Sequence, residues 1–468
     1  YLHRPELRLG NMMKRVIPIL VFLLFSLSQV FSVTLEELDK VMLKNNPTIR
    51  QSEETVLQAA LDVKDAKANY QPTISLSGSA TYMMDPPLGA ITMESSSVLS
   101  QMGLGAYSNL ASGYVTLYDG MENTMYMGSL SLTQPIFTWG KLSKAVDLYS
   151  YAYDANVNRR TDVVRQNQAE LRVRLWSLKY LEELEELVGE AIDLSQELVD
   201  IAKSGFENGM VLKQDYLSAQ ISQMETEIRE AEVEKNKNDV LVGLEALLGD
   251  HPLDLSSLVL EEDFSRYMAR SKEELLAKAT SSSSSNISAA RDLLSVYTTQ
   301  KEIAERSMYG LPDFALQVSL SLNGSRLPLV ETGWRQKGSH SLNLSVGFSS
   351  TLWDGGKILH NLEKAKSNIR TAEATLDSAY TQIKGAVESN LTSMSYCFSN
   401  MEYLESKIQN KESELELLKT QVAYGQKSRM DVITKELEIV AEKSTLVTMR
   451  IQLAQNVFTL DYLVGEGF

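Results

Sequence analysis

The sequence predicts an α+β membrane protein with an internal duplication. Long coiled-coil helices are expected to build a helical barrel, and four β-strands per chain are expected to contribute to a β-barrel. Three observations support this fold class: a seven-residue stretch that occurs twice, a long helical pattern after each copy, and four segments that alternate apolar with small polar residues. Each helical pattern covers about 64 residues and would extend roughly 95 Å at 1.5 Å per residue, more than a compact domain holds.

The duplication is anchored by residues 135–141 and 351–357, which align without a gap at a shift of 216 residues. The same shift still aligns Asp215 with Asp431 far downstream. A gap-free register over such a distance indicates two copies of one unit. We therefore divide the chain into an N-terminal segment, 1–32, a first repeat, 33–250, and a second repeat, 251–468.

Residues 1–32 have the pattern of a secretory signal peptide. Lys14 and Arg15 precede an apolar run over 16–27, and Ser32 fits a small-residue cleavage site. Residues 1–11 precede two methionines and are interpreted as sequence upstream of the true start. The chain carries 61 acidic against 45 basic residues, which argues against nucleic acid as a partner.

The composition offers no basis for enzymatic chemistry. The four histidines share no metal-ligand spacing, and no phosphate loop or nucleophile elbow is found. Cys397 is the only cysteine and lies in a helical pattern, so we expect a small apolar helix residue rather than a disulfide or a lipid anchor. The sequence predicts no cofactor, no metal site and no enzyme.

Each repeat is expected to open with a broken helix. Thr34 and Glu37 form a capping-box pattern at the start of helix 34–69, and Asn46-Pro47 breaks that helix. The second repeat opens with helix 272–308, whose break is expected near Asn286-Ile287, after a serine run.

Four segments with period-two alternation are predicted to be strands: 73–83, 128–137, 314–322 and 340–350. Each has about the length that a tilted strand needs to cross a bilayer, and the polar face of Ser, Thr, Asn and Gln suits a water-filled lumen. Leu344 is assigned to the lipid face and Ser345 to the lumen face. A half-buried sheet of a soluble protein has the same alternation and is the alternative. A fifth strand around Tyr114–Tyr118 is possible within the loop 84–127.

A strand-to-helix junction follows the second and fourth strands. Gly140 and Gly356 are expected to allow the bend, with Trp139 and Trp353 beside them and a lysine opening each helix.

The long helices are predicted over 141–204 and 357–420, and the return helices over 211–248 and 428–463. Two apolar rows run along the first long helix with coiled-coil spacing. The first row is Leu184, Leu187, Ala191, Leu194, Leu198 and Ile201, and the second is Val188, Ile192 and Val199. A helix with two rows needs two neighbours, which predicts a ring of helices. Four strands cannot close a barrel, because closure needs at least about eight. The chain is therefore expected to form a homotrimer with twelve strands.

The duplicated order of these elements resembles the TolC-like outer membrane efflux protein family. The resemblance covers nearly all of the chain after the signal peptide and rests on the helix opening at Thr34, Asn46-Pro47, the segment 134–137 with Gly140, the Gly209–Asp215 and Gly425–Asp431 pairs, and the Leu-Leu-Gly type of ending. It implies a passive exit duct of a tripartite efflux or type I secretion system. The duct would lie in outer membrane lipid with a large periplasmic part, and a periplasmic adaptor and an inner-membrane efflux pump or ABC transporter would deliver small molecules or proteins.

The resemblance also implies a constriction at the periplasmic tip. Asp215 and Asp431 fall on positions where the family places acidic or polar residues, and Lys427 falls where it often has a basic one. Thr434 stands where a second acidic residue is expected, and Tyr424 lies near the position of the tip tyrosine.

Two alternatives remain at this stage. Ser428 and Asp431 also form a capping-box-like pattern, so Asp431 can cap a helix, line a pore, or do both. The whole chain can alternatively be a secreted or surface coiled-coil structural protein, such as an adhesin. Such a fibre has no reason to place two amphipathic strand pairs at matching points of a duplication.

Overall fold

The computed structural model describes residues 34–85, 88–110, 112–118, 120, 122–249, 260–261, 263–281, 284–324 and 340–466. The predicted signal peptide, 1–32, lies outside the described residues. The chain forms two compact units. The helical unit comprises Tyr1–Gln58, Asp154–Asp292 and Glu373–Phe468, and the strand unit comprises Ala59–Tyr153 and Leu293–Ala372. Each unit takes segments from both repeats, so the compact units are not the repeats.

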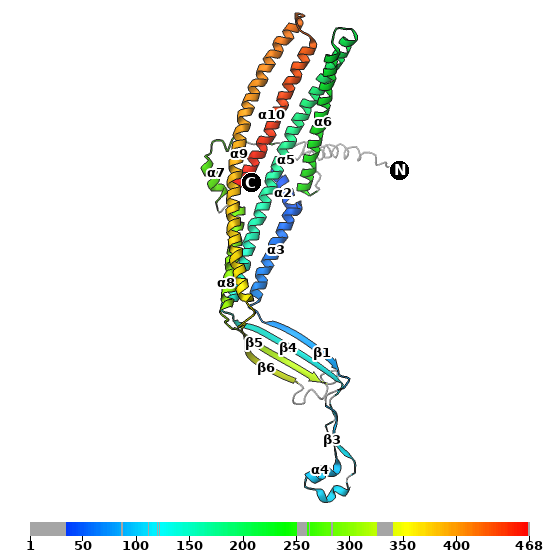
Figure 1. Cartoon of the computed structure of the whole chain (residues 1–468), viewed down its shortest axis with the longest axis vertical. Helices are drawn as coiled ribbons and strands as arrows, with labels where there is room; N and C mark the ends of the chain where they lie inside the picture. The colour runs from blue at the N-terminus through cyan, green and yellow to red at the C-terminus, as the bar shows by residue number, and fades with distance from the viewer. Residues whose placement is uncertain are drawn as a thin grey trace, which may run out of the picture. The chain divides into compact units, whose positions relative to one another are not determined.

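The helices follow one another in the order that the sequence predicts (Figure 1). The two long helices each end three residues later than expected. The bounds are α2 (Leu35–Asn45), α3 (Pro47–Ala68), α5 (Lys141–Glu207), α6 (Lys213–Leu248), α7 (Lys272–Ala279), α8 (Ser285–Met308), α9 (Lys357–Ala423) and α10 (Arg429–Val464). Among the described residues, no helix combines the length and the apolar character needed to span a membrane.

The helix openings show where local chemistry decides a boundary. The capping box of Thr34 and Glu37 is confirmed, and Pro47 starts α3 directly after the break at Asn46. The predicted break in the second opening helix is present, but it lies a few residues before Asn286-Ile287, because α7 ends at Ala279 and α8 begins at Ser285. Ile287 is fully buried among the helices, which is why the chain is helical there rather than broken.

One antiparallel sheet forms the centre of the strand unit, with the order β1-β4-β5-β6. Its strands are β1 (Thr73–Tyr82), β4 (Thr124–Phe137), β5 (Asp313–Gly324) and β6 (His340–Ser349). The register of the pairs sorts the side chains into rows across the sheet. Leu76, Leu130, Leu320 and Leu342 form one row, and Ser75, Ser131, Ser319 and Asn343 form the next. One face is therefore apolar and the other polar, because directly paired residues point to the same side.

β4 begins four residues before the predicted 128. Thr124 pairs with Tyr82, so the early start gives every residue of β1 a partner. The fifth strand near Tyr114–Tyr118 is present as β3, but it pairs with β2 (Ile91–Glu94) in a separate two-stranded sheet. A short helix α4 (Ser95–Gln101) and a 3-10 turn η1 (Gly105–Leu110) connect these two strands.

The helical unit packs around several apolar clusters that repeat the duplication. Residues from α2 and the start of α3, including Leu38, pack on α5 and α6. Residues from α7 and α8, including Leu275, pack on α9 and α10, and Cys397 is buried in that second cluster as expected. A third cluster joins α5, α6 and α10. The helices therefore follow one another as α6, α5, α10 and α9 (Figure 1).

The two rows predicted on α5 are buried to different extents. Leu198 is buried, but the other members of the predicted first row are only partly buried. In the predicted second row, Val188 and Val199 are buried and Ile192 is partly buried, and Leu181 and Ala202 outside both rows are buried as well. Leu184 and Ala191 of the first row line an open groove beside α5, whereas Leu194 and Ile201 pack against the cluster of α5, α6 and α10.

Candidate functional site

The helical unit ends in two turns that have the same construction. In the α5–α6 turn Gly209 has φ 71°, and in the α9–α10 turn Gly425 also has φ 71°. The amide after each glycine donates to a carbonyl five residues earlier, at 2.7 and 2.9 Å. This is the glycine-terminated helix end in which a left-handed residue reverses the chain. The two turns therefore occupy equivalent positions in the two repeats, and each leads into a return helix. The starts of α6 and α10 pack in the same apolar cluster with α5.

The two return helices start with different caps. Ser428 caps α10, and the Asp431 carboxylate accepts hydrogen bonds from the Ser428 amide at 2.9 Å and hydroxyl at 2.8 Å. The capping interpretation of Asp431 is thus confirmed. These hydrogen bonds lower the pKa of Asp431, the amide contributing most, because they favour the charged carboxylate. The cap position of α6 is Leu212, whose side chain offers no hydrogen bond, so Asp215 has no equivalent partner there.

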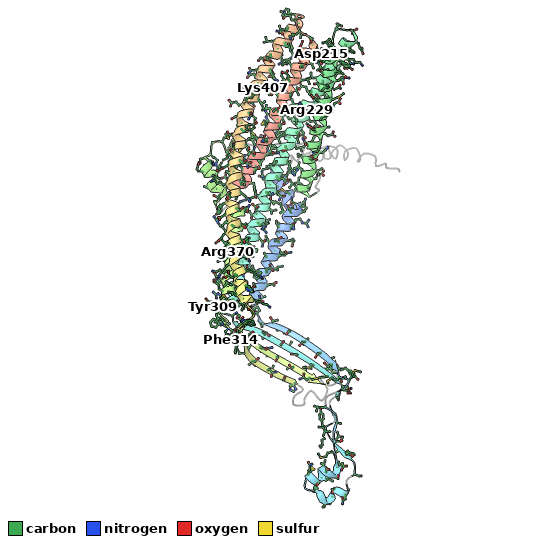
Figure 2. All side chains as sticks on the ribbon, viewed as in Figure 1. Asp215, Arg229, Tyr309, Phe314, Arg370 and Lys407 are labelled. Carbon is green, nitrogen blue, oxygen red and sulfur yellow. The ribbon has the colours of Figure 1, made fainter. Side chains whose placement is uncertain are left out.

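A groove brings three of the predicted residues together. It lies between α6 and α10 with α5 as its floor, encloses about 1120 Å³, and includes Asp215, Asp431 and Thr434 in its lining; we call it the tip groove. Figure 2 shows Asp215 near the turn end of α6 and Arg229 farther along the same helix. The charged lining residues are Asp215, Glu225, Arg229, Glu232, Asp431 and Glu438. The excess of carboxylates makes the groove attractive to cations and unfavourable for anions.

The other two predicted residues lie outside this lining. Tyr424 and Lys427 both occupy the α9–α10 turn and are exposed. The charge of Lys427 adds to the lowering of the Asp431 pKa but ranks behind the Ser428 hydrogen bonds. The structure thus separates turn residues from groove residues, whereas the sequence groups all five as one constriction.

An ion pair that the sequence reasoning missed connects the two helical hairpins. The Arg429 guanidinium on α10 binds both oxygens of Glu197 on α5, at 2.8 and 3.0 Å, and lowers the pKa of Glu197. Both side chains are more than a third exposed, so the pair is worth at most about 1 kcal/mol. A signal was present in the sequence, because an arginine directly after a helix cap is unfavourable to the helix dipole unless a partner faces it.

The strand–helix junctions form in the strand unit with unusual backbone conformations. Gly140 and Gly356 have φ 74° and 89°, and Trp139 is the one non-glycine residue with positive φ, 53°, among those that the structure describes. Glycine adopts positive φ without the steric cost that a Cβ imposes. The bend at the first junction is therefore shared by Trp139 and Gly140.

Side-chain contacts hold the first junction in place. The Trp139 indole donates to the Pro312 carbonyl at 2.9 Å, and Arg306 donates to the Trp139 carbonyl at 2.6 Å. Lys141, the first residue of α5, pairs with Asp313 at 3.1 Å. These contacts offset the strain of the positive φ at Trp139 and join the start of α5 to the start of β5.

The second junction is built by an aspartate. The Asp354 carboxylate accepts from the amides of Gly356 at 3.1 Å and Ile358 at 2.9 Å, which caps α9. Trp353 is 86% exposed and therefore does not play the anchoring role of Trp139. The duplicated motif thus has two different local solutions.

Exposed aromatic and apolar residues gather in the chain segments that join helices to strands. Figure 2 shows Tyr309 and Phe314 at this place. The exposed members are Tyr70, Phe137, Trp139, Tyr309, Leu352 and Trp353. Belts of aromatic residues of this kind mark the membrane–water interface in transmembrane barrels.

Comparisons with known proteins agree with these features. The model of the family described as outer membrane efflux protein matches residues 40–250 and 310–466. The outer membrane protein TolC of Salmonella enteritidis is 22% identical over 383 residues, 79% of this chain and 75% of that protein. TolC of Escherichia coli K12 is 21% identical over 384 residues, with the same shares.

Solved structures show the same fold. The outer membrane protein VceC of Vibrio cholerae superposes with a TM-score of 0.71 at 17% identity, over 93% of this chain and 96% of that chain. The CmeC outer membrane channel of Campylobacter jejuni superposes with a TM-score of 0.70 at 16% identity, over 93% of this chain and 86% of that chain.

Proposed function

Since the chain belongs to the outer membrane efflux protein family, we propose that three copies of it form a passive export channel. The channel crosses the outer membrane as a twelve-stranded barrel and continues into the periplasm as a tunnel of helices. The observation that carries this proposal is the four-stranded sheet with one apolar face, one polar face and two open edges.

The sheet fits a lipid-embedded barrel segment better than a soluble sheet. Leu76, Leu342 and Leu344 on the apolar face are 81%, 71% and 73% exposed, and the described residues provide no second layer over them. A soluble protein covers such a face with helices or a second sheet, whereas lipid covers it in a membrane. The polar face then lines the lumen.

The open edges require further strands. β1 and β6 are the edge strands of the sheet, and unpaired backbone groups are not tolerated in lipid. Pairing of β6 with β1 of the next copy satisfies both edges, and closure after three copies gives twelve strands. This interface is head-to-tail and closes by rotation, as ring-forming interfaces do.

The helical unit supports the same assembly. Its two end helices, α6 and α9, each carry an exposed apolar row with coiled-coil spacing. The α6 row is Leu217, Ile221, Met224 and Ile228, and the α9 row is Tyr396, Tyr403 and Leu417. Contact between α6 of one copy and α9 of the next covers both rows and closes a ring of helices.

We further propose that this channel receives its cargo from an inner-membrane efflux pump or ABC transporter through a periplasmic adaptor. Small molecules or proteins are the cargo class that fits such a duct. The acidic lining of the tip groove supports a constriction that favours cations, with Asp215 and Asp431 as its charged residues. The alternative, a coiled-coil adhesin, is disfavoured because a fibre has no use for the two-faced sheet.

The assembly and the conduction can be tested on one preparation. The protein extracted from outer membranes in mild detergent is expected to have about three times the mass of the mature chain. Inserted into planar bilayers, the trimer should give discrete conductance steps. A stable monomer in membranes, or a trimer without conductance, would contradict the proposal.

A further inference from the structure

The segment between β1 and β4 has a defined fold but no core of its own. β2 and β3 pair over Ile91–Glu94 and Tyr114–Tyr118, and the Ser95 amide at the start of α4 donates to the Gly113 carbonyl at 3.0 Å. None of its described residues is buried. An isolated two-stranded sheet is only marginally stable in water, so this segment needs burial from another surface. We call residues 90–120 the insert.

The chemistry of the insert favours association with itself. Glu94 and Asp119 are the two charged residues of the insert in the sequence. The exposed large apolar residues of the insert are Ile91, Met102, Leu104, Tyr107, Tyr114, Val115, Leu117 and Tyr118. The absence of lysine and arginine from this stretch argues against anionic lipid head groups as its partner. An apolar surface with few charges can instead pack on copies of itself if its carboxylates stay at the rim.

The topology places this surface beside the seam between copies. The chain enters the insert from β1, an edge strand, after the last β1–β4 pair at Tyr82 and Thr124. This is the end of the sheet away from the junctions, because β1 starts after α3 and β4 ends before α5. The proposed trimer joins β1 to β6 of the neighbour and therefore brings three inserts to the same mouth of the barrel.

We propose that the three inserts of a trimer pack against one another and form a cap over the outer mouth of the channel. The inference rests on the proposed trimeric channel and adds a second constriction, at the end of the barrel away from the strand–helix junctions. The apolar surface of each insert packs against the same surface of the inserts in the two neighbouring copies. Three tethered copies meet at a high effective concentration, so contacts that are weak in isolation suffice.

The insert can be removed with little disturbance of the sheet. A Cβ on Gly120 would lie 2.9 Å from the Ala90 amide nitrogen, so the two ends of the insert lie close together. Replacement of residues 91–119 by two glycines should keep the β1–β4 register. We expect the shortened trimer to have an unchanged number of subunits and a single-channel conductance higher by about twofold or more, since a constriction in series has been removed.

Direct contact between inserts is tested by cross-linking. Tyr107→Cys and Leu104→Cys place thiols on the apolar surface, while Ser97→Cys on exposed polar α4 is the matched control. The natural Cys397 is buried and does not compete. With a short bis-maleimide, the purified trimers carrying the first two changes should give covalent dimers and trimers, and the Ser97→Cys trimer should give fewer.

The outcomes separate the cap from the channel. If the unmodified protein is not a trimer, the proposed function itself fails. If the trimer is intact but the thiols at 104 and 107 do not cross-link, the inserts do not pack on one another and the cap is overturned. Unchanged conductance after the deletion also overturns it, as does quenching of a fluorophore at Tyr107→Cys by spin-labelled lipid, which would show that lipid covers the insert.

Discussion

Asp215 and Asp431 occupy the same place in the two repeats but have different surroundings. Asp431 is held by the Ser428 amide and hydroxyl, whereas Asp215 has no side-chain cap beside it. Both line the tip groove. Asp431 can therefore act both as a helix cap and as a charge in the groove, whereas Asp215 can act only as a charge. Comparing the two residues separates the effect of charge from the effect of capping.

Neutralising each aspartate separately should distinguish charge from capping. Asp215→Asn and Asp431→Asn should both weaken the cation selectivity of the trimer in planar bilayers, because each removes three carboxylates from the proposed constriction. Asp431→Asn should in addition lower the free energy of unfolding by up to about 1 kcal/mol, because the asparagine keeps only part of the cap. Unchanged selectivity in both variants would show that these residues only shape the turns.

The pH dependence follows from the lowered pKa of Asp431. A depressed pKa in the folded state means that the cap contributes stability above the unfolded value of about 3.8, and that this contribution is lost as the pH falls through the folded pKa. In acid, the stability difference between the wild type and Asp431→Asn should therefore shrink. Thermal unfolding of the two proteins between neutral pH and about pH 3 measures this directly.

Gly140 and Gly356 share positive φ but differ in the space around them. A Cβ on Gly140 would meet the Arg306 guanidinium at 2.6 Å and disturb the hydrogen bond from Arg306 to Trp139. At Gly356 the nearest atom would be 3.7 Å away. Gly140→Ala should therefore reduce the yield of outer-membrane trimer more than Gly356→Ala, and valine at both positions should reduce it most. Normal trimer yield from the double valine variant would refute the backbone argument.

At the scale of the elements, the sheet faces decide whether the strands cross a membrane. Leu344 pairs with Val318, and Ser345 pairs with Gln317, so the two neighbours belong to opposite faces. Asp at Leu344 should reduce trimer assembly, because a charge on the lipid face is destabilising by up to about 2–4 kcal/mol for the most costly side chains. Asp at Ser345 should be tolerated in the lumen. Equal tolerance in an outer-membrane assembly assay would mean that the faces are misassigned or that the sheet is soluble.

Periodic patterns over many residues predicted the helices and strands more accurately than single helix-breaking residues predicted their ends. The period-two segments and the long helices appear close to the expected bounds, because burial and pairing act over many residues and average out local noise. The break expected near Asn286 lies a few residues earlier, between Ala279 and Ser285, because the buried Ile287 holds Asn286 and its neighbours in the first turn of α8. The position of Arg429 opposite Glu197 depends on how two hairpins dock, which spacing within one helix does not specify.

The sequence predicted which residues belong to the candidate site, but not which of them lie together in the structure. The shared groove position of Asp215, Asp431 and Thr434 arises because α6 and α10 both pack against α5, one on each side of it, and no pattern within one repeat contains that information. The exposure of Tyr424 and Lys427 in the α9–α10 turn depends on the geometry of the glycine turn. The role of these residues in a constriction stays a prediction until selectivity is measured.

At the scale of the whole molecule, the duplication leaves α6 and α9 each with a neighbouring helix on one side only. Each repeat supplies a long helix and a return helix, and a linear order of four has two ends, α6 and α9. In a single chain the apolar rows at both ends face water. Ile228 is 60% exposed and Tyr403 is 64% exposed, whereas equivalent rows between helices are buried. Closure of the ring removes both ends together.

If the ring closes in this way, charged substitutions in α6 and in α9 should each cause the same loss of the trimer. Glutamates at Ile221 and Ile228 of α6, or at Tyr396 and Tyr403 of α9, should each shift the detergent-extracted protein from trimer to monomer, because either pair places charges in the same apolar interface. Combining both pairs should cost less than the sum of the two, since the interface is lost only once. Ile221→Val with Ile228→Val is the control and should remain trimeric. Native mass spectrometry measures the number of subunits, and circular dichroism verifies that the helices persist. A trimer that tolerates the α6 glutamates but not the α9 pair would show that the two rows do not face each other.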